Sequence, residues 1–122
     1  MAPVTRRAVV AGAAALTVTG PAAAAEPLYG MVGRIRALPG RRAALIAILA
    51  EGTGAMPGCL SYVVAEDLAD PDAILVTEIW RTREAHAASL QLPAVRDAIV
   101  RGRPLIASFE PLAETRPVAG VR

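Results

Sequence analysis

The chain has 122 residues, a length that fits one domain with at most a short appendage. Its positive charges are all arginines, 13 of them against 11 acidic residues, and we read the absence of lysine as a bias of base composition. The one cysteine, Cys59, excludes an internal disulfide, and the sequence has too few ligands for a metal site, no phosphate-cradling glycine loop and no serine triad.

The first 25 residues have the pattern of an export signal. The pair Arg6-Arg7 is followed by an Ala/Val/Leu-rich stretch and then by four alanines directly before Glu26. The apolar stretch is shorter than the roughly 20 residues of a membrane span, so no span is expected in the mature protein. We therefore expect residues 1–25 to be a signal peptide, of the twin-arginine type, that directs a mature domain of residues 26–122 to the periplasm or the cell exterior. The alternative is an uncleaved alanine-rich anchor or tail.

Without the signal, the chain has equal numbers of basic and acidic residues, 11 of each. Nucleic-acid binding would need a dense basic patch, and none is present in the remaining sequence. A mature domain of this size buries a limited fraction of its surface, so pairing with a second chain would stabilise it.

The first predicted elements are a strand over residues 28–37 and a helix over residues 41–51, separated by a Pro-Gly turn. Alternation in the strand gives one apolar face, made of Tyr29, Met31, Gly33, Ile35 and Ala37. In the helix, apolar residues recur at helical spacing. The glycines of the strand indicate close approach of another group.

Residues 59–66 and 73–80 predict two further strands, which the Asp- and Pro-rich turn between them joins as a hairpin. In the second of these strands, one face carries Ile74, Val76, Glu78 and Trp80, and the other carries Leu75, Thr77 and Ile79.

Thr82 is the predicted N-cap of a helix that ends near Leu90, and Pro93 is expected in the first turn of another helix that ends near Arg101. Residues 105–110 predict a last strand, with a Pro-containing edge tail to Val118.

The resulting order β-α-β-β-α-α-β predicts an α+β fold, the ferredoxin-like split βαβ, with a four-stranded antiparallel sheet and helices on one face. The other face of the sheet is then uncovered, and we expect a homodimer in which two sheets pair.

Residues 73–90 bring together the side chains best suited to chemistry. Trp80 is either the wall of a pocket or part of the core. Glu78 shares its face, and a buried carboxylate needs a partner, for which we expect an arginine. His86 has an ordinary pKa near neutrality and could take a phenolic proton, although a lone helical histidine is also common at surfaces and caps. Tyr62 is expected in the core or at a dimer interface.

Five motifs occur in a characteristic order: residues 56–62 (MPGCLSY), 70–72 (DPD), 77–80 (TEIW), 84–95 (EAHAASLQLPAV) and 104–109 (PLIASF). Together they resemble the antibiotic biosynthesis monooxygenase family, whose dimers form an α+β barrel, over about residues 29–110. Within it the chain is most similar to small proteins described as quinol monooxygenases. Some members oxygenate aromatic hydroquinones or anthrones without a cofactor, others degrade haem, and many have no known activity.

The chain departs from the haem-degrading members of that family. These carry an asparagine on the first strand and a histidine late in the helix after the tryptophan. The matching positions here hold Ile35 and Ser89, whereas Trp80 matches. His86 lies three residues before Ser89, on the same side of the helix. Haem is therefore disfavoured as a cofactor.

The resemblance implies a cofactor-independent monooxygenase that oxidises a small aromatic hydroquinone or quinol with O2, with His86 as the base. The expected site comprises catalytic His86 and Trp80 and substrate-binding Tyr29, Met31, Glu78 and Ser89. The alternative function is that of a non-catalytic exported dimer that binds haem or another apolar small molecule.

Overall fold

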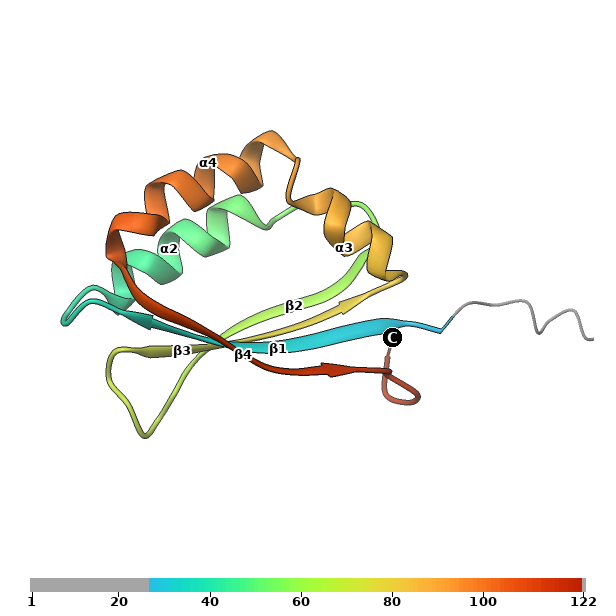
Figure 1. The fold of residues 1–122 in the computed structure, drawn as a ribbon, viewed down its shortest axis with the longest axis horizontal. Helices are drawn as coiled ribbons and strands as arrows, with labels where there is room; N and C mark the ends of the chain where they lie inside the picture. The colour runs from blue at the N-terminus through green and yellow to red at the C-terminus, as the bar shows by residue number, and fades with distance from the viewer. Residues whose placement is uncertain (1–26, 122) are drawn as a thin grey trace, which may run out of the picture.

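The computed structural model describes residues 27–121, and Figure 1 shows a sheet with helices on one side of it. The export signal predicted for residues 1–25 lies outside this range. Within the range, no helix is long and apolar enough to cross a membrane. The structure therefore tests the fold of the predicted mature domain and leaves the signal as a prediction.

Within residues 27–121, four strands form one antiparallel sheet in the order β2-β3-β1-β4. The elements are, in chain order, β1 (Tyr29–Ala37), α2 (Arg42–Gly52), β2 (Cys59–Glu66), β3 (Ala73–Trp80), α3 (Arg83–Ser89), α4 (Pro93–Gly102), the 3-10 turn η2 (Arg103–Leu105) and β4 (Ile106–Thr115). The α-helices cover one face of the sheet (Figure 1). This arrangement confirms the predicted ferredoxin-like α+β fold.

The alternation predicted along β3 is also confirmed. On the face beneath the helices, Ile74 is fully buried and Trp80 is 1% exposed. On the opposite face Thr77 is exposed, and its neighbours Leu75 and Ile79 are half-buried. One row of β3 side chains therefore packs towards the helices, and the other row faces away from them.

Helix α3 begins where the sequence predicts. Thr82 has extended backbone angles, and its hydroxyl oxygen accepts a 3.0 Å hydrogen bond from the backbone N–H of Ala85. The bond satisfies one of the free N–H groups of the first turn. Glu84 lies in the same turn, where the helix dipole favours its charge. The cap fixes the start of α3 directly after β3 and thereby sets the position of His86.

Helices α2 and α4 approach closely at Gly52. A Cβ atom at this position would overlap the side chain of Ala98 and would lie 3.2 Å from the carbonyl oxygen of Ala94. Pro93 occupies the start of α4, as predicted. The two helices form a roof over the sheet, and the buried residues that join roof and sheet are Ile35, Ala37, Leu45, Ile74 and Val76.

Two details of strand pairing go beyond the sequence prediction. β4 spans Ile106–Thr115, so its pairing with β1 continues through Pro111 into the predicted edge tail, and proline is tolerated there because β4 is an edge strand. In β2, the pairing with β3 has a register shift between Cys59 and Ser61. Beyond the shift, Tyr62 pairs with Glu78 of β3.

Candidate active site

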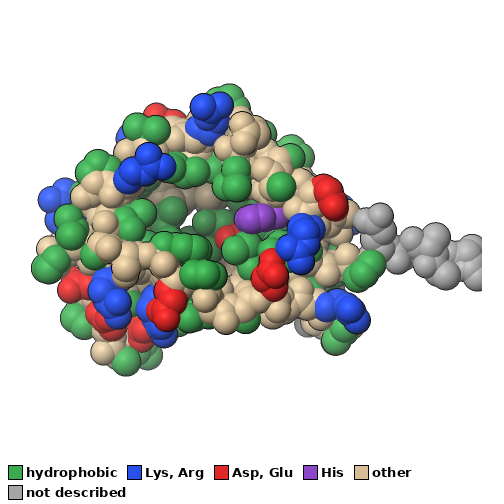
Figure 2. Space-filling model, in the orientation of Figure 1, with side chains coloured by type: hydrophobic (Ala, Val, Ile, Leu, Met, Phe, Trp, Pro, Cys, Tyr) green, Lys and Arg blue, Asp and Glu red, His purple; other side chains and the backbone are tan. Residues whose placement is uncertain are grey.

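A cavity of about 570 Å³ lies between the helices and the sheet. Figure 2 shows it as a hollow, with the histidine side chain at its wall. Most of the lining is apolar and includes Met31, Ile35, Leu45, Leu49, Val76, Leu90, Val95, Ala98, Ile99, Ile106 and Phe109. The size and lining are those of a site for a small apolar molecule.

The wall formed by β4 depends on a glycine. Phe109 lines the cavity and is 57% exposed. A Cβ atom at Gly33 on the neighbouring β1 would lie only 3.1 Å from the Phe109 ring. The glycine thus leaves room for the aromatic ring beside the sheet, in agreement with the close approach predicted from the glycines of this strand.

Glu78 and His86 place an acid–base pair in the apolar lining. The Glu78 side chain is 13% exposed, and its Oε1 atom lies 3.8 Å from Nε2 of His86. The same oxygen accepts a 2.8 Å hydrogen bond from the indole N–H of Trp80. The carboxylate thus has two polar neighbours within the largely apolar lining.

The expected arginine partner of Glu78 is not what the structure shows. In the described part of the chain, the groups beside its carboxylate are Trp80 and His86. The nearby arginines of β1 lie on the opposite face of the sheet, where Arg34 pairs with Glu110 at 3.1 Å and Arg36 with Asp70 at 2.7 Å. The parity of the strand therefore separates these cations from Glu78.

Aromatic rings hold His86 in place. The Trp80 ring meets it edge-on, with centroids 5.4 Å apart and planes at 74°, and the Tyr29 ring lies 5.8 Å away. Trp80 itself is 1% exposed and lies behind the histidine. The structure thus brings Trp80, Glu78 and His86 together as the sequence suggests, with Trp80 as support for the other two.

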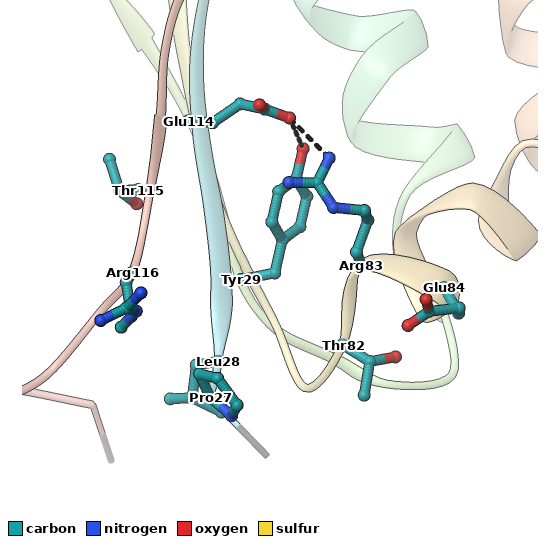
Figure 3. Close-up of a pocket in the computed structure, with 9 residues that line it drawn as sticks. All are labelled: Pro27, Leu28, Tyr29, Thr82, Arg83, Glu84, Glu114, Thr115 and Arg116. Atoms are coloured by element: carbon teal, nitrogen blue, oxygen red, sulfur yellow. Dashed lines mark hydrogen bonds and ion pairs between the residues drawn. The ribbon is translucent and has the colours of Figure 1, made fainter.

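Tyr29 contributes to a second, more open cleft, of about 600 Å³, at the edge of the molecule. Figure 3 shows Tyr29 and Arg83 converging on Glu114. The Tyr29 hydroxyl donates to Glu114 at 2.7 Å, Arg83 donates to the same oxygen at 2.9 Å, and the Arg83 guanidinium lies 4.5 Å from the centre of the Tyr29 ring. The hydroxyl of Tyr29 is therefore engaged outside the apolar cavity.

The surroundings of this cluster shift the pKa values of the Tyr29 phenol and the Glu114 carboxyl. Burial raises the pKa of the Tyr29 phenol, and the hydrogen bond to Glu114 raises it further. The same hydrogen bond lowers the pKa of the Glu114 carboxyl, as does the neighbouring guanidinium of Arg83. Both shifts favour the same state of the cluster, in which the phenol is neutral and the carboxylate is ionised.

The remaining predicted residues lie in different surroundings. Met31 lines the apolar cavity. Ser89 is 4% exposed, and its hydroxyl donates a 2.6 Å hydrogen bond to the backbone carbonyl of His86. The structure therefore brings Met31 to the cavity and directs the Ser89 hydroxyl to its own helix.

Tyr62 is the polar lining residue to which sequence reasoning gave no role in chemistry. It packs partly against the core, as expected, but it also lines the cavity next to Glu78 on the neighbouring strand. Burial raises the pKa of its phenol, and the charge of Glu78 adds to this. The pairing of Tyr62 with Glu78 across the hairpin is the signal that could have indicated it.

Within residues 27–121, no group of three or more His, Cys, Asp or Glu side chains is arranged to hold a metal ion.

The fold and the cavity define a small α+β domain with an acid–base pair inside an apolar chamber. A family profile described as antibiotic biosynthesis monooxygenase matches residues 28–101. The chain belongs to the antibiotic biosynthesis monooxygenase family, which confirms the resemblance noted in the sequence. Membership of this family supports a general monooxygenase-type function.

Several solved structures are also similar to this chain. A protein of Chloroflexus aurantiacus J-10-fl, provisionally described as an antibiotic biosynthesis monooxygenase, is 61% identical, with a TM-score of 0.74 over 76% of this chain and 95% of that one. A Deinococcus radiodurans protein with the same provisional description is 28% identical, with a TM-score of 0.63 over 77% and 96% of the two chains. One from Nitrosomonas europaea, 12% identical with a TM-score of 0.72 over 80% and 97%, shares the fold. A search of curated proteins found no match.

Proposed function

We propose that this protein is a cofactor-independent monooxygenase that oxidises a small aromatic hydroquinone or quinol with O2. The observation that carries the proposal is the pair Glu78–His86, 3.8 Å apart, within a mostly apolar cavity of about 570 Å³. An electron-rich aromatic anion can pass an electron to O2 directly. The protein then has to supply a base, an apolar chamber and the exclusion of water.

The proposed reaction begins with proton transfer. His86 takes the proton of a substrate hydroxyl group, so the O–H bond breaks and an N–H bond forms on the imidazole, beside the Glu78 carboxylate. The aromatic anion gives one electron to O2, and the two radicals join through a new C–O bond at a ring carbon. The imidazolium returns its proton to the peroxide, and loss of water with the hydrogen of that ring carbon leaves a new carbonyl. One oxygen atom enters the product and the other leaves as water.

The site residues have distinct proposed roles in this scheme. His86 is the base, Glu78 stabilises its protonated form, and Trp80 holds both through its N–H and its ring. Met31 and the aliphatic residues of the roof form the walls. Ser89 positions the His86 backbone through its 2.6 Å hydrogen bond to the carbonyl oxygen.

Assembly and location are part of the proposal. We propose a homodimer formed through the sheet face that the helices leave open, where Leu75 and Ile79 lie half-buried and Val63 is 51% exposed. Apolar side chains gathered on one face of a small domain favour such pairing. We further propose export through the predicted signal of residues 1–25.

Oxygen uptake with a panel of hydroquinones tests the proposed activity. His86→Ala should lower the rate at least tenfold, because general-base catalysis contributes about a hundredfold or more. Full activity in this variant would remove His86 from the mechanism. Haem titration, followed by the Soret band, tests the alternative: tight binding without turnover would indicate the non-catalytic binding protein instead.

A further inference from the structure

The hydroxyl group of Tyr62 differs from the other uncharged polar side chains in and beside the cavity. The indole N–H of Trp80 donates to Glu78, the hydroxyl of Thr53 donates to the Leu49 carbonyl at 2.6 Å, and the hydroxyl of Ser89 donates to the His86 carbonyl. Within residues 27–121, no hydrogen bond engages the Tyr62 hydroxyl. It is thus a donor available to a molecule in the cavity.

Tyr62 lies in the same cavity wall as the acid–base pair of Glu78 and His86. The strand register sets it directly opposite Glu78, and both side chains line the same cavity as His86. Burial and the Glu78 charge raise the pKa of the phenol. Tyr62 therefore keeps its proton over the whole neutral range and acts as a donor, whereas His86 is the group that can accept a proton.

An anion formed in this cavity needs such a donor. Once a substrate hydroxyl has lost its proton, its oxygen is negative, surrounded by apolar walls and close to the carboxylate of Glu78. A fixed hydrogen-bond donor aimed at developing negative charge is worth more in such a place than in water. Among the uncharged side chains of the lining, Tyr62 has the suitable group.

We propose that Tyr62 donates a hydrogen bond to the substrate oxygen that His86 deprotonates, and that this bond makes the cavity selective for phenolic hydroxyl groups. The inference rests on the proposed function. In the step concerned, the proton of the substrate moves to the imidazole, and Tyr62 keeps its own proton throughout. An aromatic ether of the same shape has no hydroxyl proton to lose, so its oxygen never carries the negative charge that would strengthen the hydrogen bond from Tyr62.

The ionisation of bound 4-nitrophenol tests the proposal without turnover. The phenolate absorbs in the visible, so its pKa in the cavity can be measured by titration against pH. In Tyr62→Phe the bound phenol should ionise at least about tenfold less readily than in the wild-type protein, because a hydrogen bond to a charged oxygen is stronger than one to a neutral oxygen, and tenfold corresponds to about 1.4 kcal/mol. Binding of 4-nitroanisole, which has no hydroxyl group, should be the same in both proteins.

Tyr29→Phe, at the other of the two tyrosines, is the matched control, because it keeps the ring beside His86 and removes only a hydroxyl group that is bonded to Glu114 outside the cavity. This variant should show the wild-type ionisation of bound nitrophenol. Unchanged ionisation in Tyr62→Phe with intact nitroanisole binding would overturn the proposal, as would failure of the wild-type protein to bind nitrophenol. Absence of oxygen uptake would count against the proposed function alone.

A spectroscopic measurement covers the case in which Tyr62→Phe does not fold. In the Tyr29→Phe background, incorporated 3-fluorotyrosine labels Tyr62 alone. Its fluorine resonance should shift on binding nitrophenolate and shift much less on binding nitroanisole. Equal shifts with the two ligands would contradict a hydrogen bond from Tyr62 to the phenolic oxygen.

Discussion

Glu78 explains at the residue scale why a base can operate in this cavity. A buried, unpaired carboxylate would be costly, and the indole N–H of Trp80 at 2.8 Å supplies one partner. His86 lies 3.8 Å away as the second polar neighbour. In the proposed reaction, a proton taken from a bound hydroxyl group places a positive charge beside this negative one, inside an apolar cavity.

The cluster of Tyr29, Arg83 and Glu114 leads to a pH-dependent prediction. The pKa of Glu114 is lowered, so its contribution to stability is present above the ordinary carboxyl pKa of about 4.3 and is lost as pH falls through the lowered value. The pKa of Tyr29 is raised, so its contribution is present below about pH 10 and is lost as pH rises through the raised value. Melting temperatures of wild type and Tyr29→Phe should differ most between these limits and converge in acid and in strong base. A difference independent of pH would contradict the assigned hydrogen bond.

The residues of the candidate site were predictable to different degrees. Trp80, Glu78 and His86 lie within one continuous stretch, so strand parity and the Thr82 cap sufficed to bring them together. The partner of Tyr29 lies 85 positions away in β4, beyond any local pattern. Tyr62 was expected in the core or at a dimer interface, because its position opposite Glu78 depends on the register of two strands and not on the pattern of one.

At the element scale, the contact of α2 with α4 makes Gly52 sensitive to substitution. Gly52→Ala should destabilise the protein, because overpacking costs about 1 to 3 kcal/mol and outweighs the gain of at most about 1 kcal/mol in helix propensity. Denaturant unfolding measures the difference. Gly54→Ala is the control: no other group lies within 4 Å of a Cβ atom there, so stability should stay the same or rise slightly. Equal behaviour of the two variants would contradict the close helix contact.

The elements themselves followed from the sequence where local chemistry decides them. The alternation of β3, the Thr82 cap and the early proline of α4 each predicted an element that the structure confirms. The Pro-containing edge tail after residue 110 was predicted, but the point where its pairing ends, at Thr115, depends on the neighbouring strand β1 and could not be predicted.

At the scale of the whole molecule, the uncovered face of the sheet predicts the assembly. The protein should elute at about twice its chain mass, and Ile79→Asp should give unfolded or aggregated material, because a charge would be placed in the apolar interface. Val100→Asp is the control, since Val100 lies on α4 and is 67% exposed. This variant should elute like the wild type. A stable, folded wild-type monomer at micromolar concentration would contradict the proposed dimer.

The fate of oxygen tests the proposed monooxygenase reaction most directly. Turnover of an active hydroquinone under ¹⁸O₂ should give a product with one labelled oxygen atom, measured by mass spectrometry, and a second label in water. A parallel reaction with unlabelled O2 in labelled water corrects for exchange of carbonyl oxygen with solvent. We expect the label in the product of the wild-type protein and its loss, with the rate, in His86→Ala. A product without label, formed at the wild-type rate, would show simple oxidation of the quinol and would contradict the account.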